Sequence, residues 1–197
     1  MDFAHSIHCH YEKFPPKNLD YGKIVHSFLK ASDALARYDQ MLKNIHKGKI
    51  LLAPLKNQET VISSRMERTI STIDTTRNVA KNNNWEAWCI FFLNAIEKQA
   101  IRNLEIAERI KGLYEEMKLV FSDTLSSKWS VNALDYIFTN PIFRNNRFTS
   151  KSGIPGPTAA RFTRILLDKE LLRTIEESSG RRPALYAFEP LLKIVRV

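Results

Sequence analysis

Residues 85–117, WEAWCIFFLNAIEKQAIRNLEIAERIKGLYEEM, decide the fold class of this chain. Apolar side chains recur there every three or four residues over about nine turns, which is the period of one face of an α-helix. Glutamate, lysine and arginine occupy the other faces. The stretch therefore predicts one long helix with a solvated side and a buried stripe. The expected stripe is Trp88, Phe92, Ile96, Ala100, Leu104, Ala107, Ile110, Tyr114 and Met117, and the aromatic residues Trp85 and Phe91 are also expected to pack in the core.

Helical patterns continue before this stretch. Residues 20–47 have apolar side chains at helical spacing, with Asp20 placed to cap the first turn. Residues 57–72 predict a second, shorter helix. Pro15 and Pro16 predict an extended arm at the start of the chain. In the first of these helices the expected inward residues are Ile24, Phe28, Leu35, Tyr38, Leu42 and Ile45.

The pattern after residue 127 is different. Short helices are expected over 131–138, 148–153 and 157–169, followed by two strand-like runs at 171–174 and 184–188. The polar turn EESSGRRP separates the two runs. Three short helices followed by a β-hairpin are the plan of a winged helix-turn-helix. The sequence therefore predicts an all-α fold, a helical bundle, with a small C-terminal winged helix-turn-helix.

The basic charge is concentrated in this last region. The chain has 30 Lys and Arg against 21 Asp and Glu, and residues 128–197 alone carry 12 basic and 6 acidic residues. A polyanion such as DNA would bind there, with the helix at 157–169 in the major groove and the hairpin tip on phosphates. A protein-docking surface is the alternative. The candidate DNA contacts are Thr158, Arg161, Arg164, Arg181 and Arg182.

Composition excludes several other classes of protein. Two cysteines are too few for a disulfide-stapled scaffold or a multi-cysteine zinc domain. No apolar run reaches the ~20 residues of a membrane span, and the first residues do not resemble a signal peptide, so we expect a cytoplasmic protein. The cluster His5, His8, Cys9 and His10 lies in the expected arm without rigid support, and no metal site is expected there.

Two stretches together resemble Fic-domain proteins, which transfer AMP from ATP to hydroxyl side chains. The first is SSRMERT at residues 63–69, which follows LLAPLKNQETVI. It is similar to the self-inhibitory helix of that family, whose pattern is Ser/Thr-x-x-x-Glu-Gly/Asn. The second combines WEAW at 85–88, IFFL at 90–93 and Gln99-Ala100, and looks like the helix that follows the Fic core.

The resemblance assigns roles to two residues of the first stretch. Ser63 and Glu67 match the inhibitory pattern, whereas Arg68 stands where Gly or Asn is usual. In the family, this glutamate pairs with an arginine of the catalytic signature and blocks the γ-phosphate of ATP. Ser63 and Glu67 are therefore the residues expected at an inhibitory or nucleotide site.

The catalytic signature of the family, H-x-F-x-D/E-G-N-G-R-x-x-R, is absent from this chain. It supplies the general base, the metal carboxylate and the phosphate loop for ATP and Mg²⁺. The family places its catalytic core between the two stretches, but here Thr72 and Trp85 are only about a dozen residues apart. We therefore expect a Fic-family protein that has lost its catalytic core. Such a protein would have no catalytic residues and no transferase activity, and it would need no cofactor.

Other functions remain open at this point. The chain could inhibit a separate Fic enzyme by placing Glu67 in its nucleotide site, or it could act as a regulator that binds DNA. An active transferase with a diverged site is disfavoured, because binding the phosphates of ATP needs backbone donors and cations placed together. Loss of a core would uncover apolar faces, so a protein partner or self-association is expected. The expected domains are an arm at 1–19, a Fic N-terminal-like unit at 20–76, a linker and long helix at 77–127 and a winged helix at 128–197.

Overall fold

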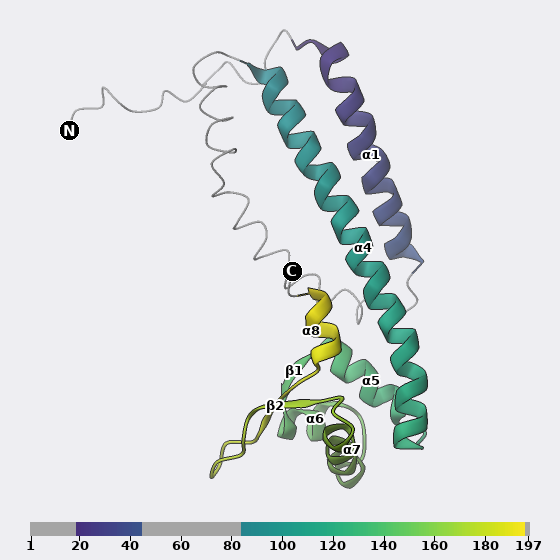
Figure 1. Cartoon of the computed structure of the whole chain (residues 1–197), viewed down its shortest axis with the longest axis vertical. Coiled ribbons are helices and arrows are strands. Elements are labelled where there is room, and N and C mark those ends of the chain that lie inside the picture. Colours follow the sequence, from purple (N-terminus) through teal and green to yellow (C-terminus); the bar gives the residue numbers. More distant parts are fainter. Residues whose placement is uncertain (1–18, 45–83, 196–197) are drawn as a thin grey trace, which may run out of the picture. The chain divides into compact units, whose positions relative to one another are not determined.

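The computed structural model describes residues 19–44 and 84–195, which belong to two compact units. The first unit contains α1 (Tyr21–Lys43) as far as Met41, and α4 (Trp85–Leu125) as far as Asn103. The second unit contains the rest of α4, which Figure 1 shows in teal, and all later elements, which it shows in green to yellow.

Three expectations fall outside the described residues. They are the helix over 57–72 with its motif at 63–69, the N-terminal arm, and the cluster of histidines in that arm. They stay predictions of the sequence.

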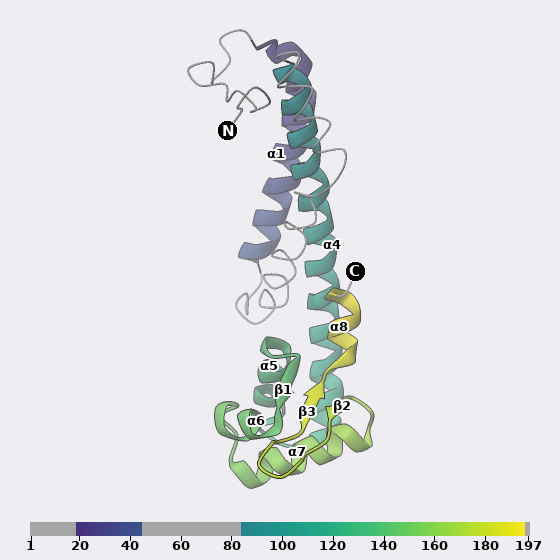
Figure 2. The same cartoon turned by 90° about the vertical axis from the view of Figure 1, so that its left-hand side faces the viewer.

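In the first unit, α1 and α4 begin close together. The Asp20 carboxylate accepts a hydrogen bond from the Gly22 N–H at 3.0 Å, and the Asp20 N–H donates to Glu86 Oε1 at 3.3 Å. Asn84 Oδ1 accepts from the Ala87 N–H at 3.1 Å. Both helices therefore begin with a side-chain cap, and the cap at Asp20 is the one predicted from the sequence. Figure 1 and Figure 2 show α1 and the first half of α4 side by side and running in the same direction.

The buried side of α1 differs from the predicted one. Its fully buried residues are Ala31 and Ala34, whereas Phe28 is 53% exposed and Leu35 is 47% exposed. The prediction that these two larger side chains point inward was wrong, because small alanines form the packed surface instead. The apolar face of α1 is therefore wider than the part of that face that is buried. Its exposed apolar residues are Tyr21, Val25, Phe28, Leu29 and Leu35.

The aromatic start of α4 is only partly packed. Trp88 stacks on Phe92 with ring centroids 5.3 Å apart, and Trp85 contacts Trp88 edge-on at 6.4 Å. Phe92 is 49% exposed, so the expectation of core packing was wrong for this residue. It was placed inward because it shares the helical spacing of Trp88, but in the structure it stacks on Trp88 at the surface.

In the second unit, the C-terminal half of α4 forms part of the core. Ile110 and Phe121 are fully buried, and Tyr114 donates a hydrogen bond to Asp135 Oδ1 at 2.5 Å. Phe121 contacts Phe188 edge-on, with centroids 6.3 Å apart. The predicted inward positions from Ala107 onward are confirmed, and the burial continues to Leu125. The expected domain boundary at residue 127 lies inside this unit.

The remaining elements are short. The elements in chain order are α5 (Ser130–Thr139), β1 (Ile142–Arg144), α6 (Asn145–Lys151), α7 (Gly156–Asp168), β2 (Arg173–Glu176), β3 (Leu185–Ala187) and α8 (Glu189–Val195). The three strands form an antiparallel sheet in the order β1-β3-β2, so that β3 lies in the middle.

Aromatic rings join the sheet to the helices. Phe143 of β1 lies 5.4 Å from Phe148 of α6 and 6.1 Å from Tyr186 of β3, measured between ring centroids. Phe138 of α5 lies 5.6 Å from Phe188. These rings form two groups, one at each end of β3, and their packing stabilises strands of three or four residues that would not be stable alone.

The described part of the chain is mostly helical, which confirms the all-α fold class. Among the residues described, the expected helices and the two strand-like runs are present close to their predicted positions, while the helix over 57–72 stays untested. Strand β1 and helix α8 were not predicted from the sequence. None of the described helices combines the length and the apolar character needed to cross a bilayer.

Candidate nucleic-acid interface

Helix α7 is held firmly by its buried side. Ala159, Phe162 and Leu166 are fully buried. Thr163 is also buried, and its hydroxyl lies 3.1 Å from both Asn145 Oδ1 and the Ala159 carbonyl oxygen. The Asn145 contact ties α7 to the first residue of α6. Helix α7 therefore presents its opposite face in a fixed orientation relative to α6.

The outer face of α7 carries the predicted contacts. Thr158, Arg161 and Arg164 follow each other at intervals of three residues, which places them on one side of the helix. Both arginines are exposed and Thr158 is half-buried. The Arg161 guanidinium lies 5.5 Å from the centroid of the Phe162 ring. Neither arginine forms an ion pair with any residue that the structure describes, so both charges are available to a ligand.

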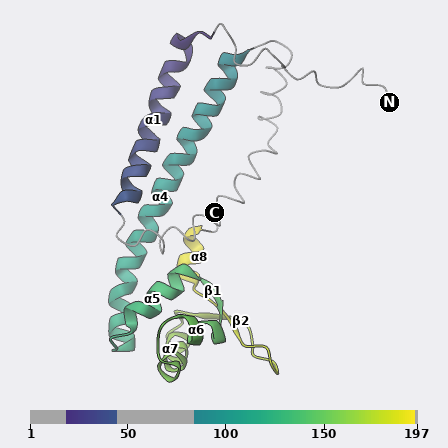
Figure 3. The ribbon, with the colours of Figure 1, turned by 180° about the vertical axis from the view of Figure 1, so that it is seen from behind.

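The hairpin formed by β2 and β3 ends in a tight turn. The Ser179 N–H donates to the Arg182 carbonyl at 3.0 Å, and the Arg182 N–H donates to the Ser179 carbonyl at 2.9 Å. Gly180 has a φ of +54°, the left-handed value that a two-residue hairpin turn requires at its first central position. Arg181 is the second central residue, at the tip. Figure 1 and Figure 3 show this hairpin projecting beyond α6 and α7.

The two arginines of the tip are not equivalent. Arg182 Nη2 lies 3.0 Å from Glu176 Oε2, and Arg144 Nη2 lies 3.0 Å from the same oxygen. Arg144 is further fixed by donating to the Pro183 carbonyl at 2.9 Å. Within the described ranges Arg181 has no ion pair. Glu176 therefore partly neutralises the predicted phosphate contact Arg182 and leaves Arg181 unaffected.

The structure adds two cations that the sequence analysis missed. Arg147 and Lys151 are exposed on α6, one helical turn apart, and neither has an ion-pair partner among the residues described. The spacing of four residues was visible in the sequence. It was missed because the expected helix there began at residue 148.

The expected inhibitory residues Ser63 and Glu67 lie outside the described residues. The structure does describe Cys89, at the start of the long helix. Burial, and to a smaller extent the Glu86 carboxylate, raise the pKa of the Cys89 thiol above its usual value. The thiol is therefore protonated at neutral pH, which makes it a weak nucleophile.

Comparison with known families gives one match. Residues 25–85 match the Fic/DOC family N-terminal model. The matched range runs from the first turns of α1 to the first residue of α4, and it includes Ser63 and Glu67. This match supports a relation to the Fic family. No curated protein matches the chain significantly.

Proposed function

We propose that this chain is a Fic-family protein by descent that lacks adenylyl transfer activity, and that its C-terminal unit is a winged helix-turn-helix that binds duplex DNA. The observation that carries the DNA-binding proposal is the arrangement of α7 and the hairpin. Both present exposed arginines, and both belong to the same packed unit.

The order of elements supports the winged-helix part of the proposal. Helix α6, a four-residue turn containing Gly153 and helix α7 follow one another as in a helix-turn-helix. Strands β2 and β3 then form the hairpin that corresponds to the wing, and β3 pairs with β1 on its other edge. In this plan α7 is the helix that enters the major groove.

The charges of the same surface support DNA as the ligand. Arg161, Arg164 and Arg181 are exposed and have no acidic partner in the described part of the chain. An arginine that has no acidic partner does not have to break an ion pair when it contacts a phosphate. Each phosphate that is neutralised also releases counterions from the duplex. Thr158 and Arg161, near the start of α7, are best placed to reach base edges.

The proposed loss of transferase activity rests on the sequence between the two Fic-like stretches. The interval from Thr72 to Trp85 contains no histidine and no glycine. A transferase needs a base, a metal carboxylate and a loop of backbone donors around the phosphates. An interval of this length and composition provides neither the base nor the phosphate loop.

Fluorescence anisotropy of a labelled duplex of mixed sequence tests DNA binding by the full chain. The double substitution Arg161→Gln/Arg164→Gln is expected to weaken binding by roughly tenfold or more at low salt. The control is Arg109→Gln/Lys111→Gln, which removes two exposed charges from α4 and should change affinity little. Absence of binding at tens of micromolar protein in low salt would refute DNA binding, and the surface would then be read as a protein-docking surface.

The family match favours a second candidate function, inhibition of a separate Fic enzyme through Glu67. The matched residues 25–85 include the whole inhibitory-type motif, although this chain lacks the arginine that its glutamate would meet. Adding the chain to an active Fic enzyme without its own inhibitory helix is expected to lower AMP transfer, and Glu67→Gly should remove that effect. Equal inhibition by both forms, or none by either, would exclude this candidate.

A further inference from the structure

Helix α1 carries a largely apolar stripe that no other described residue covers. Its side chains follow one another at intervals of four and three residues, which places them on one side of the helix. Tyr21, at its start, is 75% exposed, and Leu29 is 60% exposed. We call this surface the α1 stripe, and it consists of Tyr21, Val25, Phe28, Leu29, Ser32, Leu35 and Ala36, all of which are exposed.

The charged side chains of α1 lie away from the stripe. Lys23, Lys30 and Arg37 follow one another at intervals of seven residues, on the opposite side of the helix. Between Tyr21 and Ala36 the stripe itself contains no charged residue, and the exposed Asp39 lies one turn after Leu35, at its end. A partner that covers the stripe therefore removes no charge from water except at the rim, so the cost of desolvation is low.

The stripe is large for a surface that is left in water. With roughly 200 Å² for a fully exposed side chain of this size, the exposed fractions of its five largest side chains leave on the order of 600 Å² uncovered. The largest apolar patch of a typical monomer measures about 300–600 Å². One partner of a standard protein interface contributes about 800 Å², part of which is a polar rim. The stripe therefore has the size of the apolar centre of one side of a dimer interface.

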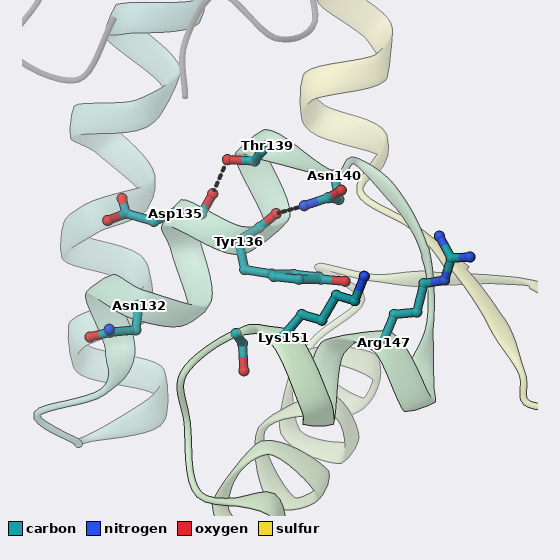
Figure 4. Close-up of a pocket in the computed structure, with 8 residues that line it drawn as sticks. Asn132, Asp135, Tyr136, Thr139, Asn140, Arg147 and Lys151 are labelled. Carbon is teal, nitrogen blue, oxygen red and sulfur yellow. Dashed lines mark hydrogen bonds between the residues drawn. The ribbon is translucent and has the colours of Figure 1, made fainter. Parts of the chain in front are cut away.

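The described residues of the second unit offer no comparable apolar surface. Polar and charged side chains line the pocket between α5 and α6, which Figure 4 shows. Leu119, Ile142 and Ile175 are exposed apolar residues of this unit, but they belong to three different elements, α4, β1 and β2. Scattered single residues of this kind are normal on a protein surface. The contiguous stripe on α1 is therefore the surface that needs an explanation.

We propose that the α1 stripe binds the α1 stripe of a second copy of this chain, in an antiparallel pair around a twofold axis. The stripe is complementary to itself in this orientation. When the axis passes midway between residues 28 and 32, Phe28 of each copy lies opposite Ser32 of the other, and Val25 lies opposite Leu35. A large side chain then meets a small one at the centre, and every contact occurs twice. A parallel pair would place Phe28 against Phe28 and leave a gap at Ser32.

Sedimentation equilibrium of the full chain tests the pairing. Between about 1 and 200 µM protein, the measured mass is expected to rise from the 22.8 kDa of one chain toward twice that value. Phe28→Glu/Leu35→Glu should raise the dissociation constant by roughly a hundredfold or more, because each dimer would bury four carboxylates without partners. Leu119→Glu is the matched control, since Leu119 is 70% exposed on α4 outside the stripe, and it should leave the dissociation constant unchanged. Circular dichroism verifies the fold of each variant.

Chemical crosslinking tests the orientation of the two helices. In a Cys9→Ser/Cys89→Ser background, a short bismaleimide should join two copies of the Ser32→Cys variant but not two copies of the Tyr21→Cys variant. In the antiparallel pair, the two copies of residue 32 are about 6 Å apart along the helix axis, whereas the two copies of residue 21 are about 27 Å apart.

Three results would overturn the proposal. The first is a monomer over the whole concentration range. The stripe would then be covered by residues of the same chain if Phe28→Glu/Leu35→Glu lowers the free energy of unfolding, and by a different protein if it does not. The second is a dimer that persists in Phe28→Glu/Leu35→Glu, and the third is equal crosslinking at residues 21 and 32. DNA binding is measured separately with the α7 variant, so the dimer and the proposed function can fail independently.

Discussion

Arg181 and Arg182 are neighbours at the hairpin tip, but the structure predicts that they contribute unequally to DNA binding. Arg182 lies 3.0 Å from the Glu176 carboxylate, whereas Arg181 has no ion pair with the described residues. An exposed ion pair of this kind is worth about 0.2–1 kcal/mol, which Arg182 loses when it turns to a phosphate. The phosphate must also approach Glu176, whose charge repels it.

Substitution of each arginine separates these effects. Arg181→Ala is expected to lower the slope of log affinity against log salt by about 0.9, the contribution of one phosphate on duplex DNA. Arg182→Ala should lower it by less than half as much. Glu176→Gln releases Arg182, so it should tighten binding by roughly 1.4- to fivefold, the equivalent of the ion-pair energy.

The assay is anisotropy of one labelled duplex, measured for each variant at several NaCl concentrations. Circular dichroism controls for folding, because Glu176 also pairs with Arg144 at the edge of the sheet. Equal slopes for the two arginine variants would refute the reasoning. So would a loss of affinity in Glu176→Gln with the fold intact.

Catalysis, thiol reactivity and core packing offer three further tests. Incubation of the chain with labelled ATP and Mg²⁺ or Mn²⁺ should transfer no label to itself or to an added protein, and transfer catalysed by the chain would contradict the proposed loss of activity. The raised pKa of Cys89 leaves less thiolate at about pH 8.5 than in a free cysteine peptide. Alkylation of Cys89 by iodoacetamide should therefore be slower than alkylation of the peptide. Glu86→Gln should shift the pH dependence of the Cys89 alkylation rate to lower pH, and a rate equal to that of the peptide would contradict a buried Cys89 thiol. Phe188→Ala should lower the free energy of unfolding in urea by about 3–5 kcal/mol, because the ring is fully buried. Phe92→Ala, at the surface, should lower it by less than about 1 kcal/mol. Equal losses in the two variants would contradict the described core.

Long elements could be predicted from the sequence, but the buried side of a helix pair could not. The period of apolar residues in α4 gave its start at Trp85 and its inward positions from Ala107 onward. The same rule failed for Phe28 and Leu35 of α1, where the pattern includes more apolar residues than one contact surface can bury. Packing selected Ala31 and Ala34, whose small side chains were not counted as candidates.

Short elements depend on tertiary contacts that a sequence pattern does not contain. Strand β1 has only three residues and follows a proline, so it has no alternation to detect; it exists because Phe143 lies opposite Tyr186 of β3. The predicted arginines of α7 and the hairpin tip proved to be exposed. It could not be predicted that Arg182 forms an ion pair and Arg181 does not, because the pairing of Glu176 with Arg182 and Arg144 depends on the register of the sheet.

The proposed DNA interface is tested most directly by amide NMR spectra of the isotope-labelled chain during titration with duplex DNA. The proposal predicts that the amides of Thr158, Arg161, Arg164 and residues 180–182 shift progressively, whereas those of residues 21–41 in α1 stay in place. Shifts confined to residues outside α7 and the hairpin, or no shifts with excess duplex at low salt, would contradict it.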